Sequence, residues 1–326
     1  MRALRRPPIV PPTLQPKGKG GRQAGRHVMA YGKNKTAKLT FTEHWNEPDV
    51  RGALFAFHGR VCAYCQTLLP HNDPGDVEHF RPKSSYWWIA YTFGNYFLGC
   101  ALCNRVCKRE RFPLPEGVAS CTYEGRGMLD AEPRLLLDPE HDPVEEWVET
   151  DWEHELCRVR PTSQVAADTP EALRCEESIK FFRLNLDIRL ITERFETVNR
   201  ALKAVPEALD GDVEKIREVK SLASRYRPHG LSVRLMLAEL APTLLPSVAE
   251  DFDLWIGELL SDLARAEKVL LESPDSEPVR KFRAEVLWAL GVAWQHPPLP
   301  VVPQDVEARL LAAGCLGDVS AIIVKL

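Results

Sequence analysis

The 326-residue sequence predicts an α+β protein in which a small cysteine-bearing domain lies between a basic N-terminal arm and a mainly helical region. Three observations lead to this prediction. Prolines, glycines and arginines crowd the first thirty residues, four cysteines form two close pairs between positions 62 and 103, and helical periodicity begins near residue 168. The length corresponds to roughly two domains of about 100–200 residues each.

Composition divides the chain into four segments. These are a basic Pro/Gly-rich arm and lead-in over 1–50, the cysteine-bearing domain over 51–143, a strand-like connector over 144–166 and a helical, partner-binding domain over 167–326. Residues 1–42 contain ten Lys and Arg and no acid, whereas the net charge of residues 114–326 is −15. A basic arm beside an acidic remainder is typical of a protein whose N-terminal part contacts phosphate, although a solvated tail would carry the same charges.

The N-terminal arm is expected to be extended. Residues 1–30 contain Pro7, Pro8, Pro11, Pro12 and Pro16 together with Gly18, Gly20 and Gly21. Proline removes a backbone donor and glycine weakens a helix, so we predict neither a helix nor a central strand there. A short helix is expected within 42–59, ending at Gly59.

The C-terminal half is expected to be a bundle of ordinary core helices. Asp168 and Thr169 precede Pro170, a typical helix start, and open a periodic segment that extends to about residue 204. A second helix is predicted over 250–272, and a third from Pro278 to about residue 295. The apolar stretch 321–326 is either a final strand or a docking edge.

Nothing in the sequence predicts a membrane protein. It has no run of about 18 apolar residues, and the basic N-terminus is not followed by an apolar stretch of the kind that secretory signals contain. We therefore expect a cytoplasmic protein. Nine cysteines, an odd number, in such a chain indicate metal binding or buried thiols rather than disulfides.

The two cysteine pairs predict a structural zinc site. Cys62 and Cys65 form one pair, and Cys100 and Cys103 form the other, each with two intervening residues. This spacing lets both thiolates of a pair reach one ion, and two pairs complete a tetrahedron. Four cysteines leave the ion no open position, so any catalysis must come from other residues. Buried thiols or a redox pair are the alternative.

Polar residues between and after the pairs predict a second metal site. Glu78 adjoins His79, Asn95 follows, and Asn104 and Lys108 stand four residues apart, on one face of a helix. Carboxylate and amide oxygens suit Mg²⁺ or Mn²⁺, and an imidazole beside such an ion can act as a base. A turn or bulge is needed to bring Glu78 and His79 to one site, because neighbouring residues of a strand point to opposite faces.

These residues resemble the HNH endonuclease family, also called the ββα-metal fold. Within it, the resemblance is to the HNH proteins of Septu-type antiphage systems and of retron-associated systems. It covers roughly residues 1–190 and is most specific over 60–143. The matching motifs are the Arg/Pro-rich start, Cys62-Ala63-Tyr64-Cys65, residues 77–83 (VEHFRPK), 86–91 (YWWIAY), 112–114 (FPL), 135–139 (LLLDP) and Asp142-Pro143.

The resemblance implies a role for each polar residue of the motif. It implies that His79 is the general base, that Glu78 and Asn104 hold the catalytic Mg²⁺ or Mn²⁺, and that Asn95 positions the His79 segment. Two departures bear on the metal, because many members carry Asp at the position of Glu78 and His at that of Asn104. Lys108 replaces a histidine of some members. An ammonium group cannot bind a cation, so Lys108 is assigned to phosphate binding.

Further substrate contacts are predicted from the charges nearby. Arg81, Lys83 and Arg105 flank the site and suit phosphate, although each is equally typical of a solvated surface. The aromatic run 86–88 is interpreted as core packing in preference to base stacking.

The sequence therefore predicts a metal-dependent HNH endonuclease that hydrolyses DNA or RNA as the nuclease effector of an antiphage defence system. The resemblance implies a partner ATPase in trans, since the chain has no Walker A motif, and extends to a retron RNA/DNA complex. Two other classes fit parts of the sequence. One is a zinc-stabilised nucleic-acid-binding module without catalysis, and the other is a structural adaptor.

Overall fold

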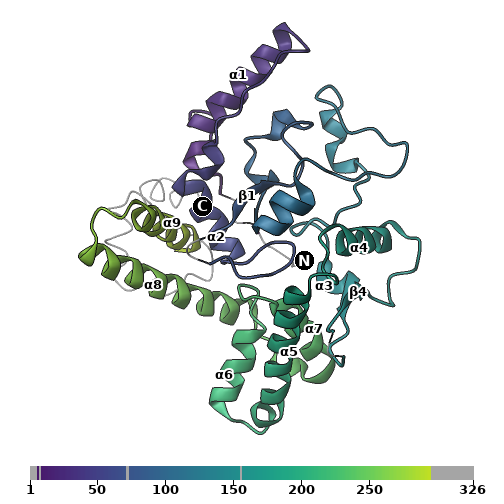
Figure 1. Cartoon of the computed structure of the whole chain (residues 1–326), viewed down its shortest axis with the longest axis vertical. Coiled ribbons are helices and arrows are strands. Elements are labelled where there is room, and N and C mark those ends of the chain that lie inside the picture. Colours follow the sequence, from purple (N-terminus) through teal and green to yellow (C-terminus); the bar gives the residue numbers. More distant parts are fainter. Residues whose placement is uncertain (1–5, 7–8, 71–72, 155, 295–326) are drawn as a thin grey trace, which may run out of the picture. The chain divides into compact units, whose positions relative to one another are not determined.

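The computed structural model describes residue 6 and residues 9–70, 73–154 and 156–294, which fall into two compact units (Figure 1). Of the described residues, one unit comprises Arg60–Ala90 and Gly94–Ser247, and the other comprises Arg6–Gly59, Tyr91–Phe93 and residues 248–294. This division differs from the expected one. The helical region expected over 167–326 is divided after Ser247, and its last helices belong with the N-terminal segment.

The N-terminal arm contains a helix, contrary to the prediction of an extended segment. Helix α1 spans Lys19–Lys33, after a single 3₁₀ turn at Pro12–Leu14. The prediction was wrong because the prolines end at Pro16, which leaves the following residues free to form helical hydrogen bonds. Gly21 is needed here, since a Cβ atom at this position would collide with the backbone carbonyl oxygen of Gln15.

Within the described residues, three further helices belong to this unit. They are α2 (Pro48–His58), α8 (Val248–Glu272) and α9 (Glu277–Trp294), which confirm the helices expected within 42–59, over 250–272 and from Pro278. Helix α2 packs closely on α9 at Gly52, and Arg51 forms a buried ion pair of 2.9 Å with Glu285 of α9. Trp255 of α8 donates to the carbonyl oxygen of Ala56 in α2. The stretch 321–326 lies outside the described residues.

The other unit is built on a short antiparallel hairpin. Strand β1 (Asp76–His79) pairs with β2 (Tyr96–Gly99) in an unbroken register from Asp76 opposite Gly99 to His79 opposite Tyr96. The bulge expected between Glu78 and His79 is absent from this strand, so the two side chains point to opposite faces. A π-helix, Leu102–Lys108, follows β2. The connector expected over 144–166 contains a second two-stranded sheet. It is formed by β3 (Val148–Thr150), which follows the single turn α3 (Val144–Trp147), and β4 (Val159–Pro161).

Four helices follow the second sheet. They are α4 (Pro170–Phe181), α5 (Ile188–Leu209), α6 (Val213–Leu222) and α7 (Gly230–Leu240). The periodic segment expected to extend to about residue 204 is thus interrupted, and α5 begins at Ile188, after Asp187, whose carboxylate caps it. The interruption places Phe182 in the core, where its ring stacks on Tyr64 at 4.1 Å. Apolar side chains of α5, α6 and α7 form one buried cluster.

Short 3₁₀ turns occupy His44–Asn46, Trp87–Ile89, Phe93–Asn95, Arg126–Ala131 and Pro242–Leu244. Among the helices of the described ranges, none combines the length and apolar character that crossing a bilayer requires.

Candidate metal centre and hydrolytic site

The four predicted zinc ligands converge on one point. The sulfur atoms of Cys62, Cys65, Cys100 and Cys103 all lie within 4.8 Å of one another, and three of the four residues are buried. A tetrahedron with metal–sulfur bonds of about 2.3 Å has sulfur–sulfur edges of about 3.8 Å. The observed 3.6 Å between Cys65 and Cys100 is close to that edge. The cluster therefore has the donors and the dimensions to hold a metal ion such as zinc.

Strand β2 explains why the two pairs meet. The backbone N–H of Ala63, inside the first pair, donates to the carbonyl oxygen of Leu98 in β2, and the second pair begins directly after β2. Each pair sits in a tight turn. The N–H of Gln66 donates to the carbonyl oxygen of Cys62, and the N–H of Cys103 points to the sulfur of Cys100 at 3.4 Å. Such N–H groups stabilise a thiolate.

The hydrogen bonds among the thiols favour one thiolate in the cluster, at Cys62. Burial alone would raise the pKa of Cys62, but hydrogen bonds from Cys100, Cys103 and Cys65 outweigh it and hold this pKa well below its usual range. Hydrogen bonding with Cys100 raises the pKa of Cys65 and of Cys103 well above theirs. One thiolate stabilised by neighbouring thiols is the arrangement from which a cation would displace the remaining protons.

His79 is buried at the end of β1 and held in one orientation. Its Nε2 lies 3.0 Å from the carbonyl oxygen of Ala90, and its ring packs edge-on against Tyr96. A carbonyl oxygen only accepts, so Nε2 carries the proton and Nδ1 is the basic nitrogen. Burial and the charge of Lys83 lower the pKa of His79 to about 3, although the bond to Ala90 opposes them. The imidazole is therefore neutral at pH 7.

Glu78 and Lys108 form a fully buried ion pair. The Lys108 Nζ lies 2.5 Å from Oε1 of Glu78 and also donates to the carbonyl oxygen of His79 at 2.7 Å. Oε2 of Glu78 accepts a hydrogen bond from the hydroxyl of Tyr64. Burial and the Glu78 charge raise the pKa of Tyr64 well above its usual range, so this hydroxyl stays protonated. Both oxygens of the carboxylate thus have partners within the protein.

This position does not suit the phosphate-binding role predicted for Lys108. Its side chain is 0% exposed, and its ammonium group is directed at Glu78 and the His79 backbone. Lys108 is the last residue of the π-helix. From there its side chain points toward β1 rather than toward solvent. A lysine at the surface would bind phosphate, whereas this one neutralises a buried carboxylate.

Asn104 and Glu78 both lie next to Gly99. A Cβ atom built on Gly99 would be 3.4 Å from the Cβ of Asn104 and 3.5 Å from that of Glu78. The two predicted ligands of the catalytic ion are therefore neighbours. The Asn104 amide donates to Asp76 at 2.8 Å, and Arg105 binds the same carboxylate through two hydrogen bonds at the surface. Asp76 was missed in the sequence, although it stands two residues before Glu78, on the same face of β1.

Asn95 joins the segment after His79 to the segment before β2. Its side-chain oxygen accepts from the backbone N–H of Arg81 at 2.8 Å, and its NH₂ group donates to the carbonyl oxygen of Arg81 at 2.9 Å. Its own carbonyl oxygen accepts from the N–H of Phe80. These three bonds fix the backbone immediately after His79, and a side chain without an amide could not form both of the bonds to Arg81.

Arg81 is directed into the protein, where it meets a residue that the sequence did not single out. Its Nε donates to Glu132 at 3.0 Å, and it also donates to the carbonyl oxygen of Leu129. Glu132 is buried and accepts two more bonds, from the hydroxyl of Tyr86 at 2.8 Å and from the N–H of Cys121 at 2.7 Å. Lys83 is half-buried. Of the four predicted phosphate ligands, Arg105 is therefore the most exposed.

The Asp-Pro motifs have structural partners. Asp138 accepts from the backbone N–H groups of Glu140 and His141, and Asp142 accepts from the N–H of Asp138 and from Arg134. These bonds close a turn ahead of α3.

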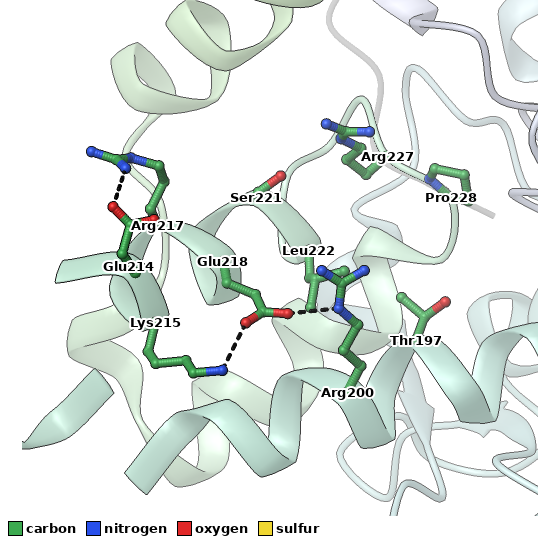
Figure 2. Close-up of a pocket in the computed structure, with 10 residues that line it drawn as sticks. All are labelled: Thr197, Arg200, Glu214, Lys215, Arg217, Glu218, Ser221, Leu222, Arg227 and Pro228. Atoms are coloured by element: carbon green, nitrogen blue, oxygen red, sulfur yellow. Dashed lines mark hydrogen bonds and ion pairs between the residues drawn. The ribbon is translucent and has the colours of Figure 1, made fainter. Parts of the chain in front are cut away.

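A charged pocket of about 570 Å³ lies between α5, α6 and the segment before α7 (Figure 2). Glu218 bridges Lys215 and Arg200 there, and Arg217 pairs with Glu214. None of the site residues predicted from the sequence lines this pocket.

The chain is similar to a known defence protein over part of its length. It is 30% identical over 125 residues to the Septu protein PtuB of Bacillus mycoides strain KBAB4, which amounts to 34% of this chain. The match spans about two fifths of that relative (41%). No protein-family model matches the chain. No solved structure matches it either. The partial match supports a protein related to the Septu defence proteins.

Proposed function

We propose that the chain is a metal-dependent HNH endonuclease that hydrolyses phosphodiester bonds of nucleic acid. The observation that carries the proposal is the fixed orientation of His79 on the hairpin that also joins the two cysteine pairs. A strand bearing Glu78 and His79, a second strand and a helix bearing Asn104 follow one another in the order that the ββα-metal resemblance implies.

In this proposal, His79 is the general base. Because Nε2 donates to Ala90, Nδ1 is the nitrogen that takes a proton from the attacking water. The imidazole is already neutral at pH 7, as a base must be. An anionic phosphate nearby would raise its low pKa and so increase its basicity. Asn95 has a positioning role, since it holds the backbone on the C-terminal side of His79.

Glu78 and Asn104 are the residues that would hold a catalytic Mg²⁺ or Mn²⁺ ion, which when bound neutralises a phosphate oxygen and stabilises the leaving oxygen. Their common position at Gly99 fits the pair. The bonds from Lys108 and Tyr64 set the orientation of the Glu78 carboxylate before any ion arrives. The four cysteines would hold a structural Zn²⁺ ion, which needs no exchangeable position.

Exposed cations provide the contacts to the phosphate backbone. Residues 17–38, which include helix α1, carry no acid. The Lys and Arg side chains of this segment are all exposed: Lys17, Lys19, Arg22, Arg26, Lys33, Lys35 and Lys38. Such a surface binds nucleic acid irrespective of sequence and releases counterions on binding. Either DNA or RNA satisfies this chemistry.

The similarity to Septu protein PtuB supports a place in antiphage defence. We propose that the chain is the nuclease effector of such a system and acts with a partner ATPase, as the family resemblance implies. Any ATP dependence would come from that partner, since the chain has no Walker A motif. A retron RNA/DNA complex is a further partner under this proposal.

The proposal is tested by incubating the chain, alone and with its partner ATPase, with plasmid DNA or total tRNA in Mg²⁺ or Mn²⁺. We expect cleavage that requires the added ion. His79→Ala should reduce the cleavage rate by about 10²- to 10⁴-fold, which is the usual contribution of a positioned base. Equal cleavage by His79→Ala and the parent protein would remove His79 from the mechanism.

One observation favours a second candidate, a zinc-stabilised nucleic-acid-binding module without catalysis. Both oxygens of Glu78 already have partners, and such a carboxylate has less capacity to bind an ion. Under this alternative the chain binds nucleic acid with equal affinity in the presence and absence of Mg²⁺ and never cleaves it.

A further inference from the structure

An aromatic cluster lies on the segment that orients His79. The 3₁₀ turn Trp87–Ile89 directly precedes Ala90, whose carbonyl oxygen accepts the bond from His79. The ring of Trp87 lies 4.9 Å from that of Tyr123, with 31° between the ring planes. Trp88 packs 6.0 Å from the same tyrosine. The rings and the candidate base therefore belong to one small region of the same unit.

The cluster is only partly core. Tyr86 is fully buried, which agrees with the interpretation of this run as core packing. Trp87, Trp88 and Tyr123 are each only partly buried, so none of the three side chains is fully enclosed in the core. Partly accessible aromatic side chains that lie beside one another are typical of a binding surface.

A cation accompanies the rings. The guanidinium of Arg126 lies 4.1 Å above the ring of Tyr123, and its side chain is exposed. It also donates to the carbonyl oxygen of Tyr123, which fixes it beside that ring. A planar cation on an aromatic face suits both a stacked base and a neighbouring phosphate.

Glu132 ties these rings to the His79 strand. Its carboxylate binds Arg81, two residues after His79, and the hydroxyl of Tyr86, one residue before Trp87. It also accepts from the N–H of Cys121, two residues before Tyr123. One buried side chain thus fixes both halves of the aromatic pair relative to the candidate base, a rigidity that simple surface packing does not require.

An unmet donor lies in the same cluster. The indole Nε1 of Trp88 is buried, and it has no hydrogen-bond partner in the described part of the chain. Such a donor weakens a fold unless an acceptor reaches it. Nucleobases offer both a flat face for stacking and acceptor atoms at their edges.

We propose that Trp87, Tyr123 and Arg126 form a stacking platform for an unpaired nucleobase of the nucleic-acid substrate. The inference rests on the proposed nuclease function and narrows its substrate class to strands with unpaired bases. A duplex hides its base faces, so the platform favours a single strand, a loop or an end. Stacking there sets the strand next to His79.

The test measures binding in buffer without added Mg²⁺ or Mn²⁺, and without a chelator, so that the strand is not cut and the cysteine cluster is left undisturbed. The probes are a fluorescein-labelled 12-nucleotide single strand, its duplex and an abasic strand of equal length and charge. The single strand is prepared both as DNA and as RNA, so that the two dissociation constants show which of the two nucleic acids the platform prefers. Fluorescence anisotropy of the full-length protein gives each dissociation constant.

We expect Trp87→Leu and Tyr123→Leu each to weaken binding of the single strand by about 5- to 150-fold, the range found when a stacking ring is removed. Binding of the abasic strand should change less than twofold. Trp87→Phe keeps a ring and should retain most of the affinity. Tyr226→Leu, which alters a half-buried tyrosine outside the platform, is the matched control and should have no effect.

Arg126→Gln changes an exposed side chain that makes no contribution to the core, and so tests the platform even if a tryptophan variant folds poorly. It should weaken single-strand binding several-fold. Unchanged single-strand binding in all three variants, or equal losses with the abasic strand, would overturn the proposal. Binding and cleavage are read separately. A nuclease assay in which His79 proves dispensable would remove the proposed activity and leave the platform standing as a binding site.

Discussion

The cysteine cluster and the Glu78 site, both on the β1–β2 hairpin, differ in whether their acceptor atoms already have a positively charged partner. The four cysteine sulfurs at one end have mainly one another as partners and converge on a single point. Glu78, on the neighbouring strand, is held by a buried lysine and a tyrosine hydroxyl. The first arrangement is short of positive charge, whereas the second already contains it. A cation should therefore stabilise the cysteine cluster strongly and must compete with Lys108 at Glu78.

The largest expected effect comes from breaking the cysteine cluster. Cys103→Ser should abolish stable metal binding and unfold the hairpin unit. In small zinc modules, the apparent binding free energy of about 10–16 kcal/mol is part of the folding free energy. Zinc content by plasma mass spectrometry and helicity by circular dichroism measure the outcome.

Cys175→Ser is the control for this experiment. Cys175 is a buried thiol in α4 that bonds to the carbonyl oxygen of Trp147 and lies outside the cluster, so its loss should leave the zinc content unchanged. Zinc retained in full by Cys103→Ser would contradict the metal-binding role of the four thiols.

The next effect comes from breaking the Glu78–Lys108 pair. Lys108→Met leaves a buried carboxylate without its cation, and the free energy of unfolding should fall by about 3–5 kcal/mol. Urea denaturation measures the loss. Added Mg²⁺ should recover part of it in this variant if Glu78 can bind a cation.

The double variant Glu78→Gln with Lys108→Met separates charge from packing. It removes both charges and should be more stable than Lys108→Met alone. A double variant no more stable than the single one would show that the ion pair is not what destabilises Lys108→Met.

A smaller effect on the free energy of unfolding is expected at Asn95, whose side chain bonds to backbone groups rather than to a charged side chain. Asn95→Ala removes both side-chain bonds to Arg81 and should lower the free energy of unfolding by about 1–3 kcal/mol. Asn95→Asp keeps the acceptor for the N–H of Arg81 but sets a buried carboxylate against the carbonyl oxygen of Arg81, so its loss should exceed that of Asn95→Ala. Urea denaturation of the two variants side by side tests this order, and the reverse order would contradict the bracing role.

The smallest effect is expected at an exposed ion pair, which sharpens the contrast with the buried one. His141 lies 3.0 Å from Asp138, but its side chain is 67% exposed, so solvent limits the pair to below about 1 kcal/mol. The hydrogen bond that His141 donates to the Asp138 carboxylate raises the pKa of His141. Burial works against ionisation of Asp138, but His141 outweighs it and lowers the pKa of that carboxyl.

The sign of the pH effect follows from these directions. The His141 contribution is complete below its unfolded pKa of about 6.5 and is lost as pH rises through the raised folded value. The Asp138 contribution is complete above about 3.9 and is lost at lower pH. The stability difference between the parent and His141→Gln should therefore be larger at pH 5.5 than at pH 8.5. If the urea midpoints of the parent and His141→Gln differ equally at pH 5.5 and pH 8.5, the predicted contribution of the His141–Asp138 pair is wrong.

Features set by residues close together in the sequence were predictable: the cysteine cluster and the helices α8 and α9. The cysteine spacing located a cluster that the structure assembles, because a two-residue gap between thiols has few other uses. The α8 and α9 helices followed from periodicity and from the prolines at their ends. The roles of His79, Glu78, Asn95 and Asn104 stay predictions until activity is measured.

Longer-range relations were not predictable. Glu132 lies 51 residues from Arg81, and no local pattern marks it as the acceptor for three separate segments. The burial of Lys108 depends on the wide turn of the π-helix, which its sequence does not signal. Helix α1 was missed because proline density was averaged over thirty residues, although no proline follows Pro16 in that stretch.

The pairing of α2 with α9 has a consequence for synthesis of the chain. Arg51 and its buried partner Glu285 are 234 positions apart, so a ribosome makes the arginine long before the glutamate. Until α9 leaves the ribosome, the Arg51 guanidinium stays hydrated, and the apolar surface of α2 that packs against α9 remains exposed to water. The hairpin unit, encoded between these helices, can finish folding first. During translation, the nascent chain thus holds a completed candidate nuclease core beside an unfinished N-terminal helix, which a chaperone would be expected to shield.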